Sequence, residues 1–395
     1  MHDLNIKNYP SAWEDILDEA VNAYKELDVL KDSYIDYLNN KYDAFPKYYD
    51  LLKKAAAEIR SNEKLAVFTS LLCIAMRDRE NIANQLDELD LPTAQDGECT
   101  VGYDLCAIFP FLQFADDMAS YLEKRDVPKD VIVSTIREFE DFISEGTPMY
   151  DRPLMNKIYL VWGQLFIDHK IIRIERFNLE FCDECHMHAK VFRDSKGEII
   201  TLVDNLRIHK SGYALGSAGY EDENGSYHAM ITETDTYYEG YPANSDGTCS
   251  VEKIRLSKSD WSCVLSHSDK TISVHIPSFE RFDPEYCTYS LEYADKILKK
   301  HFSDFDFKAY TCHSWFLEPQ LDELLSPSSK IISFKNRFTV VPTISDDKAV
   351  FDNAFDRLPV TDYNELKPKT GLERSIKAHY LAGKHLYEYS GYFFL

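Results

Sequence analysis

The sequence predicts an α+β (α/β-like) protein in which a helical domain, residues 1–170, precedes a mixed-sheet domain, residues 171–395. In the first part glycine is sparse, and apolar residues recur three and four positions apart, which is helical spacing. From Ile171 onward β-branched and aromatic residues alternate with polar ones, and helical patterns return only after Val274. This order of patterns is typical of a mixed sheet packed beside a helical domain.

Two segments support the helical domain. Within Val131–Ile143, the apolar residues fall four, three and four positions apart, so they share one face that we expect to be buried. These residues are Ile132, Ile136, Phe139 and Ile143. The stretch Lys64–Asp78 is apolar nearly all round, which predicts a buried central helix.

The second domain begins with strand patterns. We expect a strand over Ile171–Phe181, a hairpin over Ala189–Val203 that turns at Ser195–Gly197, and a further turn at Asn224–Gly225. Later segments alternate between strand and helix. The expected strands are 307–311, 330–341 and 387–395, and the expected helices are 319–325 and 371–381.

Charge and composition limit the partners. The chain has 44 basic and 67 acidic residues, a formal net charge of -23, so we expect neither nucleic acid nor a membrane surface as a partner. No stretch reaches 18 apolar residues, and no charged start precedes an apolar run, so we expect neither a membrane span nor a signal peptide. The nine cysteines follow no repeating framework, which is typical of reduced thiols in a cytoplasmic protein.

The stretch Thr271–Leu298 reads as strand, loop and helix, a layout that can hold a phosphorylated ligand. Asp283-Pro284-Glu285 is a strong helix start, but its acids place negative charge where an anion would bind. The loop "PSFERF" has no glycine, and Arg281 is its local cation. Possible further cations are Lys253, Arg255 and Lys258. A phosphate site and a plain turn therefore both remain possible.

Three residues are candidates for catalysis. His275 ends the expected strand, where it could act as a general base, although a lone histidine more often bonds a neighbouring carbonyl. Cys312 and Ser314 end another expected strand, so they would lie near His275 if the two strands are neighbours. The alternative for Cys312 is an ordinary core position.

Two further clusters favour plainer interpretations. "CDECHMH", Cys182–His188, offers thiols and imidazoles to zinc, but a second ligand pair is missing, so we expect polar turn chemistry and no metal. Glu233, Asp235 and Glu239 could do acid–base work only if burial or a neighbour shifted the pKa of one of them. On an exposed strand these carboxylates would be solvated.

Several strings occur together in the order of a known family. They are "IERFNLEF", "ETDTYYEGYP", "RLSKSDW", "VHIP", "CHSWFLEPQLDELL", "SSKIISFKNRF" and "TGLERSIKAHYLAG". With them the chain resembles bacterial acyltransferase-domain proteins that have a helical N-terminal acyltransferase region and a GNAT-like (Gcn5-related N-acetyltransferase) C-terminal domain. The resemblance is specific over residues 171–395.

The resemblance implies a sheet in which the pantetheine arm of acyl-CoA enters between two splayed strands, one ending at His275 and the other at Cys312. It places the pyrophosphate at the loop Ser278–Phe282 and the helix from Pro284. The implied acyl-CoA contacts are Ile276, Ser278, Phe279 and Arg281. A small-molecule or peptide amine would attack the thioester, with His275 as base and Cys312 or Ser314 near the thioester.

One feature of the superfamily is missing. Its phosphate loop, Gln/Arg-x-x-Gly-x-Gly/Ala, does not occur in this sequence. Two hypotheses follow: an acyl-CoA-dependent N-acyltransferase, or a catalytically silent GNAT-like module that binds a ligand or a partner.

Overall fold

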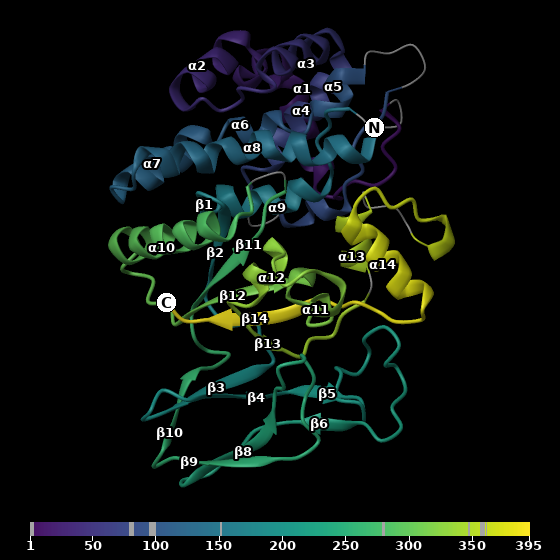
Figure 1. Ribbon diagram of the computed structural model, residues 1–395. Coiled ribbons are helices and arrows are strands. Elements are labelled where there is room, and N and C mark those ends of the chain that lie inside the picture. Colours follow the sequence, from purple (N-terminus) through teal and green to yellow (C-terminus); the bar gives the residue numbers. More distant parts are fainter. Residues whose placement is uncertain are drawn as a thin grey trace. The chain divides into compact units, whose positions relative to one another are not determined.

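The structure, a computed structural model, describes residues 4–78, 83–94, 100–150, 152–278, 281–346, 348–355, 360 and 362–395. The chain divides into two compact units, residues 1–175 and 176–395. Helices make up most of the first unit, and strands and helices alternate in the second (Figure 1). The protein is therefore α+β, as the sequence predicts.

The first unit is helical until its last strand, β1 (Ile171–Ile174). Its α-helices are α1 (Trp13–Ala23), α2 (Asp32–Tyr42), α3 (Tyr49–Ser61), α4 (Glu63–Ala75), α5 (Thr100–Leu105), α6 (Phe109–Leu112), α7 (Ala115–Lys124), α8 (Lys129–Tyr150) and α9 (Ile158–Ile167). Short 3-10 turns cover Tyr24–Glu26, Asp28–Leu30 and Ala83–Glu88.

Helix α4 is the buried central helix that its composition predicts. Its N-cap is Asn62, whose Oδ1 accepts a hydrogen bond from the backbone N–H of Leu65 at 3.2 Å. Residues on all of its sides are buried, among them Phe68 and Leu72. The apolar stripe predicted for α8 is also buried. No helix in the described ranges is long and apolar enough to cross a membrane.

The second unit contains two sheets and a small strand pair. Its strands are β2 (Phe177–Cys182), β3 (Ala189–Asp194), β4 (Ile199–Val203), β5 (Leu206–Ile208), β6 (Tyr227–Ala229), β7 (Thr232–Glu233), β8 (Tyr237–Pro242), β9 (Ile254–Ser257), β10 (Trp261–Leu265), β11 (Thr271–His275), β12 (Ala309–Ser314), β13 (Thr339–Val341) and β14 (Tyr389–Phe393). Its α-helices are α10 (Pro284–His301), α11 (Leu321–Leu324), α12 (Lys330–Lys335), α13 (Lys348–Ala354) and α14 (Gly371–Leu381), and 3-10 turns cover Trp315–Leu317 and Tyr363–Glu365.

Within this unit the central sheet has the order β2-β11-β12-β14-β13. Strands β11 and β12 are parallel, and the other neighbours are antiparallel. The second sheet has the order β10-β3-β4-β8-β7, with β9 paired to β8, and forms a separate layer (Figure 1). Strands β5 and β6 pair with each other.

The two faces of the central sheet pack against different elements. On one face, Tyr392 belongs to a buried cluster with Val191 of the second sheet, and its hydroxyl lies 2.7 Å from Thr201 Oγ1. On the other face, the ring of Phe181 contacts Phe302 directly after α10, with centroids 4.9 Å apart. The ring of Phe177 contacts Phe334 of α12, with centroids 5.8 Å apart. We call these the sheet-covered face and the helix-covered face.

Two predictions of local structure are wrong. Residues 330–341 do not form one strand, because α12 precedes β13. The β-branched residues of the segment 330–341 favour a strand, but a helical turn buries Ile332 in a cluster with Trp315 and Leu321. The expected strand over Ile171–Phe181 breaks at Glu175, which has a φ of 50°. The turn of the β3–β4 hairpin and the bounds of α14 agree with the sequence pattern.

Candidate functional site

The pairing of strands β11 and β12 stops before either strand ends. Their register pairs Thr271 with Ala309, and its last pair is Ser273 with Thr311. Beyond that pair, β11 runs on to His275 and β12 runs on to Ser314. We call this interruption of the pairing, with the two strand ends that flank it, the opening.

The outer neighbours hold the two sides of the opening in place. On one side β11 remains paired with β2 as far as His275, which is opposite Asn178. On the other side β12 remains paired with β14 as far as Ser314, which is opposite Tyr389. Each strand end is therefore part of a ladder, although the two ends no longer pair with each other.

His275 lies at one side of the opening and contacts a carboxylate. Its Nε2 is 2.8 Å from Oε2 of Glu180 on β2. The side chains of His275 and Glu180 are 31% and 25% exposed, so both are accessible from solvent. Because residues 271, 273 and 275 pair with 182, 180 and 178, both side chains are on the sheet-covered face. The carboxylate orients the imidazole ring.

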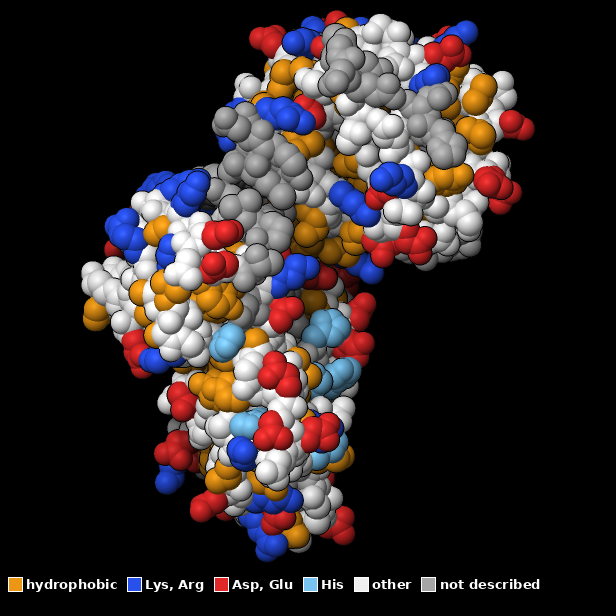
Figure 2. Space-filling model, turned by 90° about the vertical axis from the view of Figure 1, so that its right-hand side faces the viewer, with side chains coloured by type: hydrophobic (Ala, Val, Ile, Leu, Met, Phe, Trp, Pro, Cys, Tyr) orange, Lys and Arg blue, Asp and Glu red, His pale blue; other side chains and the backbone are white. Residues whose placement is uncertain are grey.

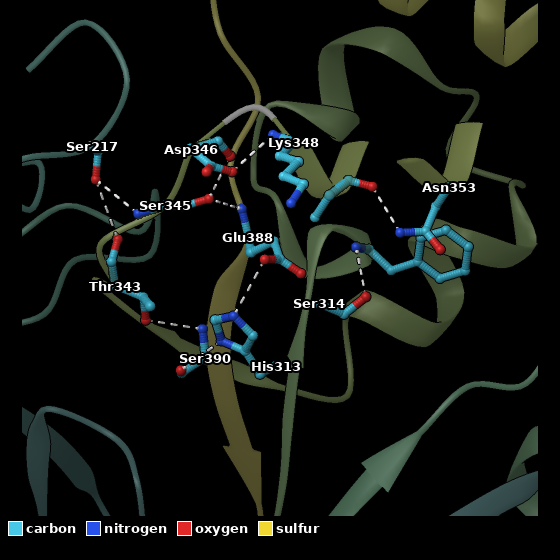
Figure 3. A network of polar contacts seen from close by, with 12 residues as sticks. Ser217, His313, Ser314, Thr343, Ser345, Asp346, Lys348, Asn353, Glu388 and Ser390 are labelled. Carbon is cyan, nitrogen blue, oxygen red and sulfur yellow. Dashed lines mark hydrogen bonds and ion pairs between the residues drawn. The ribbon is translucent and has the colours of Figure 1, made fainter. Parts of the chain in front are cut away.

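His313 lies at the other side of the opening and was not among the residues predicted from the sequence. Thr271 pairs with Ala309 and Ser273 with Thr311, so His313 is at the register position that corresponds to His275, on the same face. Its Nε2 is 3.5 Å from Glu388 Oε2, and its Nδ1 is 3.2 Å from Ser390 Oγ (Figure 3). The alternation of "TCHSW" separates His313 from its neighbours, but choosing the correct face requires the strand pairing.

Cys312 and Ser314 are on the helix-covered face, because successive strand residues point to opposite faces. Cys312 is 2% exposed, and burial raises the pKa of its thiol to about 12. Ser314 Oγ accepts a hydrogen bond from the N–H of Phe316 at 3.1 Å, which caps the following 3-10 turn (Figure 3). The structure thus places His275 and His313 at corresponding positions on the sheet-covered face, whereas Cys312 and Ser314 are on the opposite face.

Three cations gather at the first turn of α10, and we call them the basic cluster. The carboxylate of Asp283 contacts Arg281, Nε to Oδ2 at 3.0 Å, and Lys330, Nζ to Oδ1 at 2.8 Å. Arg337 Nη2 donates to the carbonyl of Pro284 at 3.0 Å and to Thr288 Oγ1 at 2.6 Å. Lys330 and Arg281 together hold the pKa of the Asp283 carboxyl below its usual range.

The basic cluster makes the charge at the start of α10 positive. Its three cations outnumber Asp283 and Glu285, although the whole chain carries a net charge of -23. Of these three cations the sequence indicated only Arg281, because Lys330 and Arg337 come from a segment about 50 residues further along the chain. Ile276 is half-buried and Ser278 is exposed before this turn, and Phe279 is outside the described residues.

The remaining candidates have structural partners. Lys258 contacts Glu233 at 2.8 Å, and Arg255 contacts Glu239, so these cations and carboxylates pair with each other on the second sheet. Cys182 and Cys185 are buried, and burial raises the pKa of both thiols. Across the described ranges, no group of three or more His, Cys, Asp or Glu side chains is arranged to hold a metal ion.

Comparison with known proteins identifies the family. Residues 177–393 match the GNAT-like C-terminal domain, and the chain belongs to that family. No curated protein matches the chain.

Solved acyltransferase structures have a similar fold. A mutant acyltransferase in complex with octanoyl-CoA has a TM-score of 0.57 at 15% identity, covering 92% of this chain and 88% of its own. An acyltransferase in complex with decanoyl-CoA and teicoplanin has a TM-score of 0.55 at 16% identity, covering 91% of this chain and 87% of its own. One in complex with CoA and 10C-teicoplanin has a TM-score of 0.55 at 15% identity, with the same coverage. At these identities the likeness shows the fold.

Proposed function

We propose that this protein is an acyl-CoA-dependent N-acyltransferase. The observation that supports this most directly is the opening between β11 and β12, with a carboxylate-bound histidine at its edge. In the GNAT-like fold such an opening admits the pantetheine arm. The structures of similar fold that hold octanoyl-CoA, decanoyl-CoA or CoA support the same ligand class.

The phosphates and the thioester of acyl-CoA would contact different side chains. The basic cluster at α10 would attract the phosphates through Arg281, Lys330 and Arg337, where the superfamily uses a glycine loop. Near the opening, the imidazole of His275 would take a proton from the acceptor ammonium, because only a neutral amine can attack a thioester. Glu180, 2.8 Å from Nε2, would orient the ring during this transfer.

The acceptor would be a small-molecule or peptide amine. Teicoplanin is present in two of the structures with similar fold, which supports an acceptor of this size class. Acidic and histidine side chains lie interspersed on the face shown in Figure 2, and the net charge of -23 favours a cationic acceptor over an anionic one.

A thiol-release assay tests this proposal. Acyl-CoAs from acetyl to decanoyl are offered with primary alkylamines, and release of CoA thiol is followed. We expect turnover, and we expect His275→Gln to lower kcat by about 100-fold, the usual contribution of a general base. His267→Gln is the matched control, because His267 is exposed on the β10–β11 connection and pairs with Glu184.

A catalytically silent module is the second candidate. It is favoured by the missing glycine loop and by the acidic residues Asp283 and Glu285 at the start of α10. Such a protein would release no thiol with any acyl-CoA, and His275→Gln would leave its ligand affinity unchanged. Calorimetry with the same acyl-CoA panel separates binding without turnover from the absence of binding.

A further inference from the structure

The opening has a second histidine with its own carboxylate. His275 and His313 hold corresponding register positions on β11 and β12 and are on the same face of the sheet. Glu180 contacts the first at 2.8 Å, and Glu388 contacts the second at 3.5 Å. A substrate between the strand ends would therefore have a histidine–carboxylate pair on either side.

Acyl transfer to an ammonium requires two proton transfers. The ammonium nitrogen first loses one proton, so that its lone pair can form the C–N bond to the thioester carbon. As the C–S bond breaks, the nitrogen loses a second proton and the sulfur leaves with the bonding electron pair. The sulfur takes up one proton to become a thiol, so the net release is one proton.

We propose that His313 carries the second proton, from the acceptor nitrogen to the departing sulfur. This inference rests on the proposed function and assigns the first proton to His275, which passes it to water. The ring of His313 accepts the proton as the C–N bond is completed and donates it as the C–S bond breaks. Its protonation state is thus the same before and after the transfer.

The contacts of His313 suit a group that accepts and releases a proton within one turnover. Its side chain is 49% exposed, so a substrate can reach the ring. Glu388 Oε2 is 3.5 Å from its Nε2, so a carboxylate lies beside the ring as Glu180 lies beside His275. Ser390 bonds Nδ1, and the N–H of Ser390 donates to Thr343 Oγ1 at 3.2 Å, which fixes this side of the opening (Figure 3).

Neither of the other candidates on β12 can fill this role. The thiol of Cys312 is buried on the helix-covered face, away from both histidines. Ser314 is on the same face as Cys312, and its hydroxyl caps the following turn. Among the described residues of β12, His313 is the titratable side chain on the face of His275.

Two nucleophiles distinguish the two histidines. Methylamine is cationic at pH 7.5 and must lose both protons, whereas hydroxylamine is mostly neutral and must lose only the second. With octanoyl-CoA and thiol release as the readout, we expect His275→Gln to slow methylamine about 100-fold and to leave hydroxylamine within about threefold of wild type. We expect His313→Gln to slow both nucleophiles about 100-fold. Glu388→Gln should reproduce the His313→Gln pattern more weakly, since Glu388 acts through His313.

The outcomes are separable. If wild-type protein releases no thiol with either nucleophile, the proposed function fails and this inference fails with it. If wild type turns over and His313→Gln keeps full activity with hydroxylamine, the inference alone is overturned. A general loss of structure is recognised by octanoyl-CoA affinity in calorimetry, which we expect to stay within threefold of wild type. His267→Gln again serves as the matched control.

Discussion

Glu318 is a buried carboxyl group that should make the stability of the second unit depend on pH. It follows the 3-10 turn after β12 and is 1% exposed. Its Oε2 accepts a hydrogen bond from the N–H of Tyr387 at 2.6 Å, and its Oε1 accepts one from the N–H of Gln320 at 3.0 Å. Burial nevertheless dominates and raises the pKa of Glu318 to about 7, from an ordinary value of 4.5.

The direction and size of the effect follow from these two pKa values. Between pH 4.5 and pH 7 the folded protein keeps a proton that the unfolded chain has released, so the free energy of unfolding falls as pH rises. The two pKa values differ by about 2.5, and each pKa unit corresponds to about 1.36 kcal/mol, so the free energy of unfolding changes by about 3 kcal/mol in total. About 2.5 kcal/mol of this falls between pH 5 and pH 8.

The variant Glu318→Gln isolates this contribution. It cannot ionise, so its stability relative to wild type should improve by about 2.5 kcal/mol from pH 5 to pH 8. At pH 5 we expect it to be about 1 kcal/mol less stable than wild type, because an amide has one acceptor oxygen for two N–H donors. Urea unfolding at each pH measures both values, with hydrogen exchange of β14 reporting on the second unit.

The control is Glu323→Gln, which removes an exposed carboxylate from the neighbouring helix α11. Glu318→Gln and wild type share all their other titrating groups, so the contributions of those groups cancel in the stability difference between the two. A stability difference between Glu318→Gln and wild type that stays constant from pH 5 to pH 8 would refute the reasoning.

Three further predictions address the site and the first unit. Cys312→Ala should keep turnover within about twofold of wild type, and the thiol, with a pKa raised to about 12 by burial, should resist iodoacetamide at pH 8 in the folded protein. Replacing Arg281 and Lys330 together by Gln should weaken acyl-CoA binding about tenfold in calorimetry at low salt, and less at high salt. Gly163→Ala should reduce the free energy of unfolding of the first unit by about 1–3 kcal/mol in urea, because its Cβ would lie 2.2 Å from the ring of Phe111.

Each of these three predictions has a result that would contradict it. A large loss of turnover in Cys312→Ala would show that the helix-covered face takes part in the chemistry. Salt-independent acyl-CoA binding by the variant and wild type alike would remove the basic cluster from the phosphate site. Unchanged stability in Gly163→Ala would mean that Phe111 moves aside without loss of packing.

Local patterns predicted the elements whose stabilising contacts are close in sequence. The start of α10 follows from Asp283-Pro284-Glu285, and the β3–β4 hairpin follows from its turn residues. The strand 330–341 was predicted wrongly because burial of Ile332 against Trp315 and Leu321 outweighed the strand preference of its residues.

The sequence indicated only some of the side chains that surround the opening, for a related reason. His275 is recognisable as the end of a strand, but its carboxylate, Glu180, is 95 residues away in the chain. The choice between Cys312 and His313 depends on which face of β12 agrees with the face of His275, and only the register of the parallel pair defines it. The cations Lys330 and Arg337 likewise reach α10 from a later segment.

The pairing of β11 and β12 has a consequence for substrates of different width. Only three register pairs join β11 to β12. His275 and Glu180 are on β11 and β2, which stay paired as far as His275. His313 is on β12, which stays paired with β14, and Glu388 directly precedes β14. A bulky acyl group that forces the strand ends apart would thus move each imidazole with its own carboxylate as a unit. The distance between the rings of His275 and His313 could then change with the width of the acyl group, while each histidine keeps its contact with its own glutamate.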